Sequence, residues 1–487
     1  MQQELHTTVS HLLTIGGDER IVPAHANGTN KYFSSPFPRQ TVTYASSTAN
    51  DISQPAFDHL CDFVADHGLN ADMVGTDYAG HLSVLRDRIA AAYGLPKGTD
   101  IAFSASGTDL EYIALQAFAG RAPQGIHNVL LGADEVGSGC ILSAAGQYFA
   151  GQTALGVATS KGQPVAGLAP VSLSEVSVRN GFGEASDSAV IVAAMRSEIE
   201  RALIAGKFPL LHVVHGSKTG LILPHLDDID ALITQFGDSI GFVVDACQAR
   251  ITSPAISAYL MRGAVVLLTG SKFMGGPPFS GFALVPRATA QRIAPLGEGM
   301  ATIFRRAELP ESWAGAENLP MSGNAGLTVR LAAALFELER FQALDFHTIA
   351  RVVEQFRCAS LALVDRIGGT RVTPYPFADR ESAGAHPIEM RTLTTVDLSG
   401  EGRAIDFDGA TAIQLRMMQS GVRLGQPVKC ARFQGPDMMG KVRGTLRIGI
   451  SMPQMVALAA LGDAAEAQLD SDMAAIGDAF EAALAAD

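Results

Sequence analysis

Short runs of apolar residues recur along the chain, with amphipathic stretches between them. Glycine or polar turns bound these runs, which are rich in β-branched residues and leucine, as is typical of strands buried on both faces. The candidate strands are DIAFSAS (100–106), NVLLGA (128–133), PLLHVVHG (209–216), GFVVDA (241–246), AVVLLTG (264–270) and FSGFALVP (279–286). Helical patterns such as 109–120 and 188–206 alternate with them. The sequence therefore predicts an α/β fold with a mostly parallel sheet of about seven strands, covered by helices on both faces.

The pattern changes after a predicted long helix at 323–341. RTLTTVDLS (391–399) and GTLRIGIS (444–451) are typical of strands, and ATAIQLRMMQSG (410–421) is typical of a helix, which indicates a smaller α+β domain. A chain of 487 residues, 47% of them hydrophobic, is long enough for two or three packed units. The predicted parts are an N-terminal arm at 1–75, a large domain at 76–334 and a small C-terminal domain at 335–487.

Composition excludes several classes of protein. The formal net charge of −13 argues against nucleic acid and anionic membranes as partners, because both attract clustered cations. No apolar run approaches the ~18–20 residues that span a bilayer, and the first 20 residues lack the basic start and long apolar core expected of a signal peptide. The five cysteines are far apart and no pair has CxxC spacing, so no metal site or disulfide framework is indicated. We expect a cytoplasmic protein without a metal.

Polar residues follow three of the predicted strands, at the sheet edge where open parallel sheets bind ligands. In the first segment, FSASGTDLE (103–111), Ser106, Gly107 and Thr108 form a turn before a helix. Backbone N–H groups at such a helix start, with the two hydroxyls, suit a phosphate group. An ordinary Ser or Thr helix cap also explains this segment.

The second and third segments carry an acid and a base. Asp245 ends a predicted strand and Gln248 follows three residues later; the carboxylate can hold a proton on a heteroaromatic nitrogen, or it can simply cap the next turn. Lys272 follows the strand 264–270, between glycines and hydroxyls. An unprotonated lysine forms a Schiff base with an aldehyde, although most lysines are solvated at the surface. Pyridoxal 5′-phosphate requires all three groups together: a phosphate cradle, an acid and a Schiff-base lysine.

In this combination the sequence resembles the fold type I pyridoxal-phosphate enzymes, and within them the class V aminotransferase and cysteine desulfurase group. The resemblance covers roughly residues 75–330 and implies an aspartate aminotransferase-like fold. In that group a D-x-x-Q strand end is followed by a lysine in a hydroxyl-rich turn and then by a Gly-Pro stretch, which here are DACQ, TGSK and GGPPFSG. The resemblance implies that Asp245 pairs with the pyridine nitrogen, Gln248 with the phenolic oxygen and Lys272 with the aldehyde. It places Thr269 and Ser271 near the phosphate.

Two further segments resemble parts of that family. HGSKTGLILP (215–224) is similar to a segment whose polar residue lies beside the cofactor ring, which would be Ser217 or Thr219. GTLRIGIS is similar to the segment whose arginine binds a substrate carboxylate, which would be Arg447. A solvated arginine on an edge strand is the alternative interpretation of Arg447.

The sequence also departs from the family pattern. ADEVGSGC (133–140) has no aromatic ring to stack on the cofactor, so Val136 or a neighbour is expected there. The residue before the lysine, often histidine in the family, is Ser271, and WAGAEN (313–318) lacks the family's threonine.

The resemblance implies an enzyme that acts on an amino acid or small amine. We expect an aminotransferase first, and second a lyase or desulfurase, for which Cys430 is the cysteine in a plausible loop. A non-catalytic binding protein on the same scaffold is an alternative of a different class. The resemblance also implies a homodimer, with residues 313–324 and the N-terminal arm as the expected crossing points.

Overall fold

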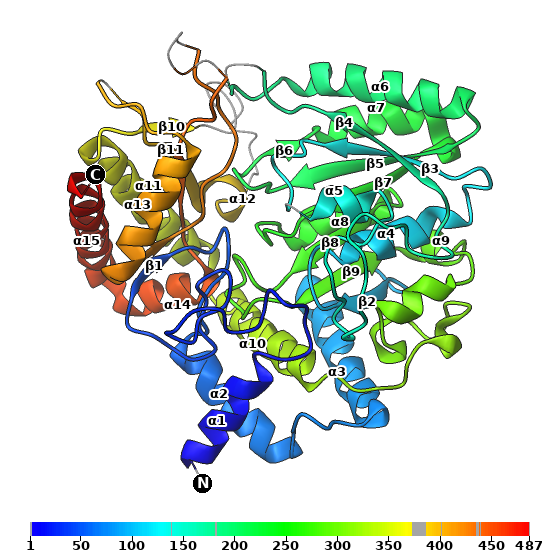
Figure 1. Cartoon of the computed structure of the whole chain (residues 1–487), viewed down its shortest axis with the longest axis horizontal. Coiled ribbons are helices and arrows are strands. Elements are labelled where there is room, and N and C mark those ends of the chain that lie inside the picture. Colours follow the sequence, from blue (N-terminus) through cyan, green and yellow to red (C-terminus); the bar gives the residue numbers. More distant parts are fainter. Residues whose placement is uncertain are drawn as a thin grey trace.

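The structure is a computed structural model that describes residues 2–137, 139–180, 183–372, 386–400, 402–434, 438 and 440–486 (Figure 1). Its large domain contains an eight-stranded sheet in the order β2-β9-β8-β7-β5-β3-β4, with β6 paired to β5 beside this path. The strands are β2 (Asp100–Ser104), β3 (Ile126–Leu131), β4 (Val171–Val176), β5 (Phe208–His215), β6 (Ile222–Leu223), β7 (Gly241–Asp245), β8 (Val265–Thr269) and β9 (Gly281–Val285). All six predicted strands are therefore confirmed.

Six of these strands run in the same direction. β3 is parallel to β4 and β5, β5 to β7, and β7 to β8. β9 is antiparallel to both β8 and β2, so β2 has the direction of β8. The carboxyl ends of β2, β8, β7, β5, β3 and β4 consequently lie at one edge of the sheet, where the sequence predicts the site.

Helices cover both faces of this sheet. On β8, Val265 and Leu267 pack in the hydrophobic cluster that contains α4 (Leu110–Ala119). The alternate residues Val266 and Leu268 pack in the cluster that contains buried residues of α6 (Ser188–Ile204), α7 (Leu226–Phe236) and α8 (Ser253–Met261). Strands buried on both faces need apolar residues at every position, which explains the continuous apolar runs.

The smaller domain follows α10 (Ala325–Gln342), which runs between the two domains in Figure 1 and spans the expected boundary at residue 335. It has an antiparallel sheet in the order β10-β11-β13. Its elements are β10 (Thr370–Val372), β11 (Leu393–Asp397), β12 (Val422–Leu424), β13 (Thr445–Gly449), α11 (Phe346–Arg366), α12 (Ile388–Arg391), α13 (Phe407–Gln419), α14 (Met452–Leu461) and α15 (Ala465–Ala485). The predicted α+β order is confirmed for the two strands and the helix named from the sequence.

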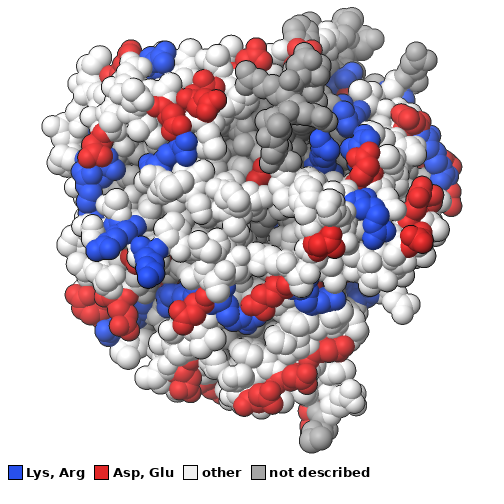
Figure 2. Space-filling view, turned by 180° about the vertical axis from the view of Figure 1, so that it is seen from behind, with Lys and Arg blue, Asp and Glu red and all other residues white. Residues whose placement is uncertain are grey.

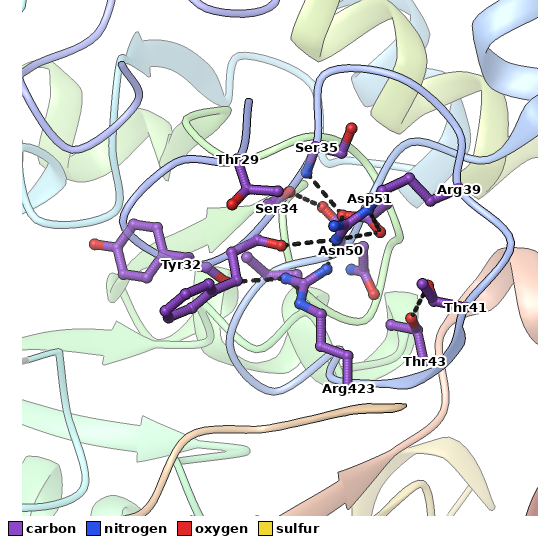
Figure 3. Close-up of polar contacts among 12 residues, drawn as sticks. Thr29, Tyr32, Ser34, Ser35, Arg39, Thr41, Thr43, Asn50, Asp51 and Arg423 are labelled. Atoms are coloured by element: carbon purple, nitrogen blue, oxygen red, sulfur yellow. Dashed lines mark hydrogen bonds and ion pairs between the residues drawn. The ribbon is translucent and has the colours of Figure 1, made fainter. Parts of the chain in front are cut away.

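The N-terminal segment is tied to the C-terminal domain. It contains α1 (Gln2–Leu12), β1 (Val42–Tyr44) and α2 (Gln54–His67), and leads into α3 (Gly75–Tyr93). β1 forms a parallel pair with β12. Next to this pair, Asp51 accepts hydrogen bonds from Arg39 and from Arg423 of β12, as Figure 3 shows. Tyr44 and its partner Leu424 are about 380 residues apart in the sequence. Backbone hydrogen bonds and ion pairs therefore join the N-terminal segment to the C-terminal domain.

The surface agrees with the composition. On the face in Figure 2, Lys and Arg side chains are scattered among Asp and Glu and do not form one continuous basic patch. Binding of a polyanion relies on such a patch of clustered cations. Among the described residues, no helix is both long enough and apolar enough to cross a membrane.

Candidate functional site

A cavity of about 440 Å³ opens at the carboxyl edge of the sheet, between the large domain, the N-terminal arm and the C-terminal domain. This volume is in the ordinary range of small-molecule sites. The cavity is lined by most of the residues that the sequence singled out: Ser106, Gly107, Thr108, Asp245, Thr269, Ser271, Lys272 and Arg447. Ser217, Thr219 and Gln248 are not among its lining residues.

The turn from β2 to α4 is packed tightly against β8. A Cβ atom at Gly107 would lie 2.8 Å from Cγ2 of Thr269 and 3.3 Å from Sγ of Cys247, so only glycine fits without a shift. Within the described part of the chain, the backbone N–H groups of Gly107 and Thr108 have no hydrogen-bond acceptor. Unengaged amides at the start of a helix form an anion-binding site.

A charged network lies behind this turn. The Arg20 guanidinium donates to both carboxylate oxygens of Asp18, at 2.8 and 2.6 Å, and to Oγ of Ser106 at 3.3 Å. Ser106 donates to Oδ2 of Asp109 at 2.7 Å. Burial, with the negative charge of Asp18, raises the pKa of Asp109 to about 7. Arg20, which lines the cavity and is paired with Asp18, is a guanidinium at this end that no sequence motif indicated.

Asp245 lies at the end of β7, where its Oδ1 accepts the backbone N–H of Cys247 at 2.9 Å. A buried pair lies nearby, in which Nε2 of His212 is 2.8 Å from Oε1 of Glu111. Burial opposes a charge on His212, but the negative charges of Glu111 and Asp245 outweigh it and raise the pKa of the imidazole. Neither His212 nor Glu111 lines the cavity, so the carboxylate at this end of β7 that faces it is Asp245.

Lys272 follows β8 in a turn that two other segments hold in place. Thr269 donates to the carbonyl oxygen of Cys247 at 2.7 Å, and Ser271 donates to Thr269 at 3.2 Å. From the N-terminal arm, Asn50 donates to the carbonyl oxygens of Ser271 and Lys272. The Lys272 amine itself has no hydrogen-bond or ion-pair partner among the described residues. The backbone is therefore fixed while the amine is left available in the cavity.

Ser217 and Thr219, expected beside the cofactor ring, instead surround a buried carboxylate. Ser217 donates to Oε2 of Glu135 at 2.7 Å, and the Thr219 hydroxyl is 2.8 Å from the same atom. Arg179 donates to Oε1 of Glu135 at 2.9 Å. Burial disfavours the charge on Glu135, but these partners outweigh it and lower the pKa. The residue between them, Lys218, is the one that lines the cavity.

Gln248 faces the boundary between the domains. Its Nε2 donates to the carbonyl oxygen of Ser47 at 3.1 Å, and its Oε1 accepts from Arg250 at 2.7 Å. The same Ser47 oxygen accepts from Nη1 of Arg447 at 3.1 Å. Gln248 is therefore linked to Arg447 through one carbonyl group.

The described residues of the segments 133–137 and 139–141 bring no aromatic ring to the cavity, as the sequence indicated. Val136, suggested for the ring-stacking position, is buried in the hydrophobic core and does not line the cavity. Cys140 and Ile141 line it instead. Arg20 lies outside every segment that the sequence analysis singled out for the site, and Lys218 lies within HGSKTGLILP but between the two residues chosen there, Ser217 and Thr219.

Comparison with known proteins relies on structure alone, since no family model and no curated protein sequence matches the chain. The cysteine desulfurase CsdA from Escherichia coli superposes with a TM-score of 0.55 at 15% identity, covering 91% of this chain and 94% of that chain. A cysteine desulfurase from Thermococcus onnurineus NA1 gives 0.53 at 14% identity, with 87% and 94% covered. Pyridoxamine-pyruvate aminotransferase from Mesorhizobium loti gives 0.50 at 18% identity, with 92% and 97% covered. The chain therefore has the fold type I architecture expected from its sequence, which it shares with these desulfurases and this aminotransferase.

Proposed function

We propose that the chain is a pyridoxal-phosphate-dependent enzyme that transaminates an amino acid. One observation carries the proposal: a single cavity brings together the available amine of Lys272, the strand-end carboxylate of Asp245 and the unengaged amides of Gly107 and Thr108. These are the covalent anchor, the acid and the phosphate site that the cofactor requires. The fold shared with desulfurases and an aminotransferase supports the same class.

The residues of the cavity fit the cofactor in three places. The Gly107–Thr108 amides and the charge of Arg20 would hold the phosphate, and Asp245 would hold a proton on the pyridine nitrogen. Lys272 would bind the aldehyde covalently. When bound, the cofactor supplies an electron sink for the substrate Cα. The amine of Lys272 would also hold and move the proton of that carbon.

The cysteines favour transamination over desulfuration. Desulfuration requires a thiolate nucleophile, but burial raises the pKa of Cys430 to about 12, and this residue does not line the cavity. Cys140 and Cys247 do line it, and burial raises the pKa of both thiols as well. Thiols of this kind are poor nucleophiles at neutral pH. A lyase that does not use a cysteine is the second candidate.

Labelling of the lysines tests the cofactor and its anchor. Two lysines other than Lys272 line the cavity, Lys218 and Lys429, so they serve as internal controls. After borohydride reduction of the purified protein, peptide mass mapping is expected to find the pyridoxyl group on Lys272 alone. A label on Lys218 would overturn the assignment of Lys272, and a protein that takes up no cofactor would be a binding protein on the same scaffold.

The reaction is tested by a half-reaction. With an amino donor alone, a transaminase is expected to convert its bound cofactor to the amine form, and a 2-oxo acid is expected to restore the original spectrum. Continuous release of ammonia or sulfur without that conversion would replace transamination by elimination or desulfuration.

A further inference from the structure

Arg447 is a buried cation without an anionic partner. It lines the cavity and its side chain is almost wholly covered. Its nitrogen atoms donate to the carbonyl oxygens of Gln426, Ser47 and Lys218, and to Oγ1 of Thr48. These four bonds leave one of its five N–H groups free, because a guanidinium carries five. Arg447 therefore contributes charge and one donor, not a free two-pronged fork.

A second buried arginine reinforces this charge. Arg250 is fully buried and donates only to neutral oxygens, those of Thr392, Gln248, Ser46 and Ile450. Burial, followed by the positive charge of Arg447, lowers its pKa to about 9. Arginine remains protonated at neutral pH under these conditions. Arg250 does not line the cavity, but its unpaired charge adds to the cost of burying the Arg447 cation, and an anion bound at Arg447 would offset part of that cost.

Lys218 adds a third cation at the same end. Its carbonyl oxygen is 3.3 Å from Nη1 of Arg447, and it lines the cavity. Burial lowers the pKa of its ammonium, and the charges of Arg447 and Lys272 lower it further. Among the described residues, no carboxylate lies within ion-pair distance of Lys218 or Arg447; Glu135, which attracts both, is already paired with Arg179.

We propose that this end of the cavity binds two anionic groups of one substrate, and that Lys218 makes the enzyme specific for acidic amino acids. One carboxylate would be held by the charge of Arg447, and the second by the three N–H groups of Lys218. A substrate with one carboxylate would leave one of the two lining cations unpaired. The proposal rests on the proposed function, since it names the substrate class of the same site.

Isosteric pairs of amino acids test this specificity. We expect L-aspartate and L-glutamate to bind at least tenfold more tightly than L-asparagine and L-glutamine, measured by titration of the visible spectrum, because only the acids neutralise the second cation. Lys218→Met keeps the length of the side chain without its charge. In this variant the preference for the acid is expected to fall close to one, with the binding of the amides nearly unchanged.

Lys429 supplies the matched control. It also lines the cavity but is exposed at the surface, where its amine lies 5.2 Å from the ring of Phe407. Lys429→Met is expected to keep the preference for acids. Equal binding of acids and amides by the unmodified protein would overturn the inference, as would loss of the preference in Lys429→Met but not in Lys218→Met.

A ligand without an amine separates this inference from the proposed function. Succinate has two carboxylates and cannot react with a cofactor, so its binding does not depend on transamination. We expect succinate to raise the melting midpoint of the protein more than butyrate does, and Lys218→Met to abolish that difference. If no amino acid changes the spectrum while succinate still stabilises the protein, the proposed function fails and the anion site stands. If amino acids do change the spectrum but succinate and butyrate act alike, the anion site fails.

Discussion

Asp109 is a carboxyl group whose charge the folded protein disfavours. It is buried behind Ser106 at the start of α4, where burial and the charge of Asp18 raise its pKa to about 7. In an unfolded chain an Asp titrates near 3.9. Between these two values the folded protein binds a proton that the unfolded chain does not. The resulting stabilisation is complete below about pH 4 and is lost as the pH rises through about 7.

Asp109→Asn is expected to remove this pH dependence, because the amide accepts the bond from Ser106 but does not ionise. As the pH rises from 4 to 7, the ionisation of Asp109 should lower the free energy of unfolding of the wild-type protein by about 1.4 kcal/mol per pH unit. The difference in melting midpoint between variant and wild type, in the same cofactor state, should therefore widen as the pH rises from about 5 to 7 and then level off. A difference that is constant over this range would show that Asp109 is ionised throughout.

At the scale of elements, the close contact between the β2–α4 turn and β8 determines the geometry of the anion site. Gly107→Ala places a methyl group 2.8 Å from Cγ2 of Thr269, so the turn must move away from β8. Overpacking of this kind costs about 1–3 kcal/mol. Because the moved amides are those expected to bind the phosphate, we expect the cofactor-free variant to bind pyridoxal phosphate roughly tenfold or more weakly in an absorbance titration.

The control for this experiment is Gly151→Ala, since a Cβ atom at Gly151 would meet nothing within 4 Å. This variant is expected to bind the cofactor as the wild type does. Unchanged affinity in Gly107→Ala would indicate that the phosphate binds elsewhere in the cavity.

At the scale of the whole molecule, an exposed apolar pair marks the segment that the sequence suggested for subunit contact. Met321 and Val74 are 61% and 57% exposed, and the backbones of residues 73–75 and 321–323 lie against each other. Exposed apolar side chains beside each other are typical of interaction surfaces. Two-fold homodimers are also the commonest assemblies. We therefore keep the homodimer as a prediction, with this pair near its interface.

Light scattering is expected to give twice the chain mass of 51.0 kDa. Met321→Glu should shift the protein toward the monomer, because it places a charge in the apolar contact. Met261→Glu, at a residue of α8 that is 75% exposed, should not. A monomeric mass for the wild-type protein with its cofactor bound would contradict the prediction.

Sequence by itself determined six adjacent strands of the large sheet, from β2 at one edge to β3, and the residues at their ends. Strands covered on both faces must be apolar at every position, so they are visible as continuous runs, and residues that follow parallel strands meet at one edge whatever the rest of the chain does. Lys272, Asp245 and the Gly107 turn were predicted on this basis, and the structure places them in one cavity.

Only the tertiary structure decided what depends on contacts between distant segments. The edge strand β4, with its mostly half-exposed residues, has no continuous apolar run, and β1 is paired only because β12 lies beside it. The direction of a loop side chain is likewise set by its packing partners. Ser217 and Thr219 turn toward the buried charge of Glu135, which leaves the residue between them, Lys218, at the cavity. No local pattern encodes that choice, because the energy of satisfying a buried carboxylate comes from groups that the fold alone brings together.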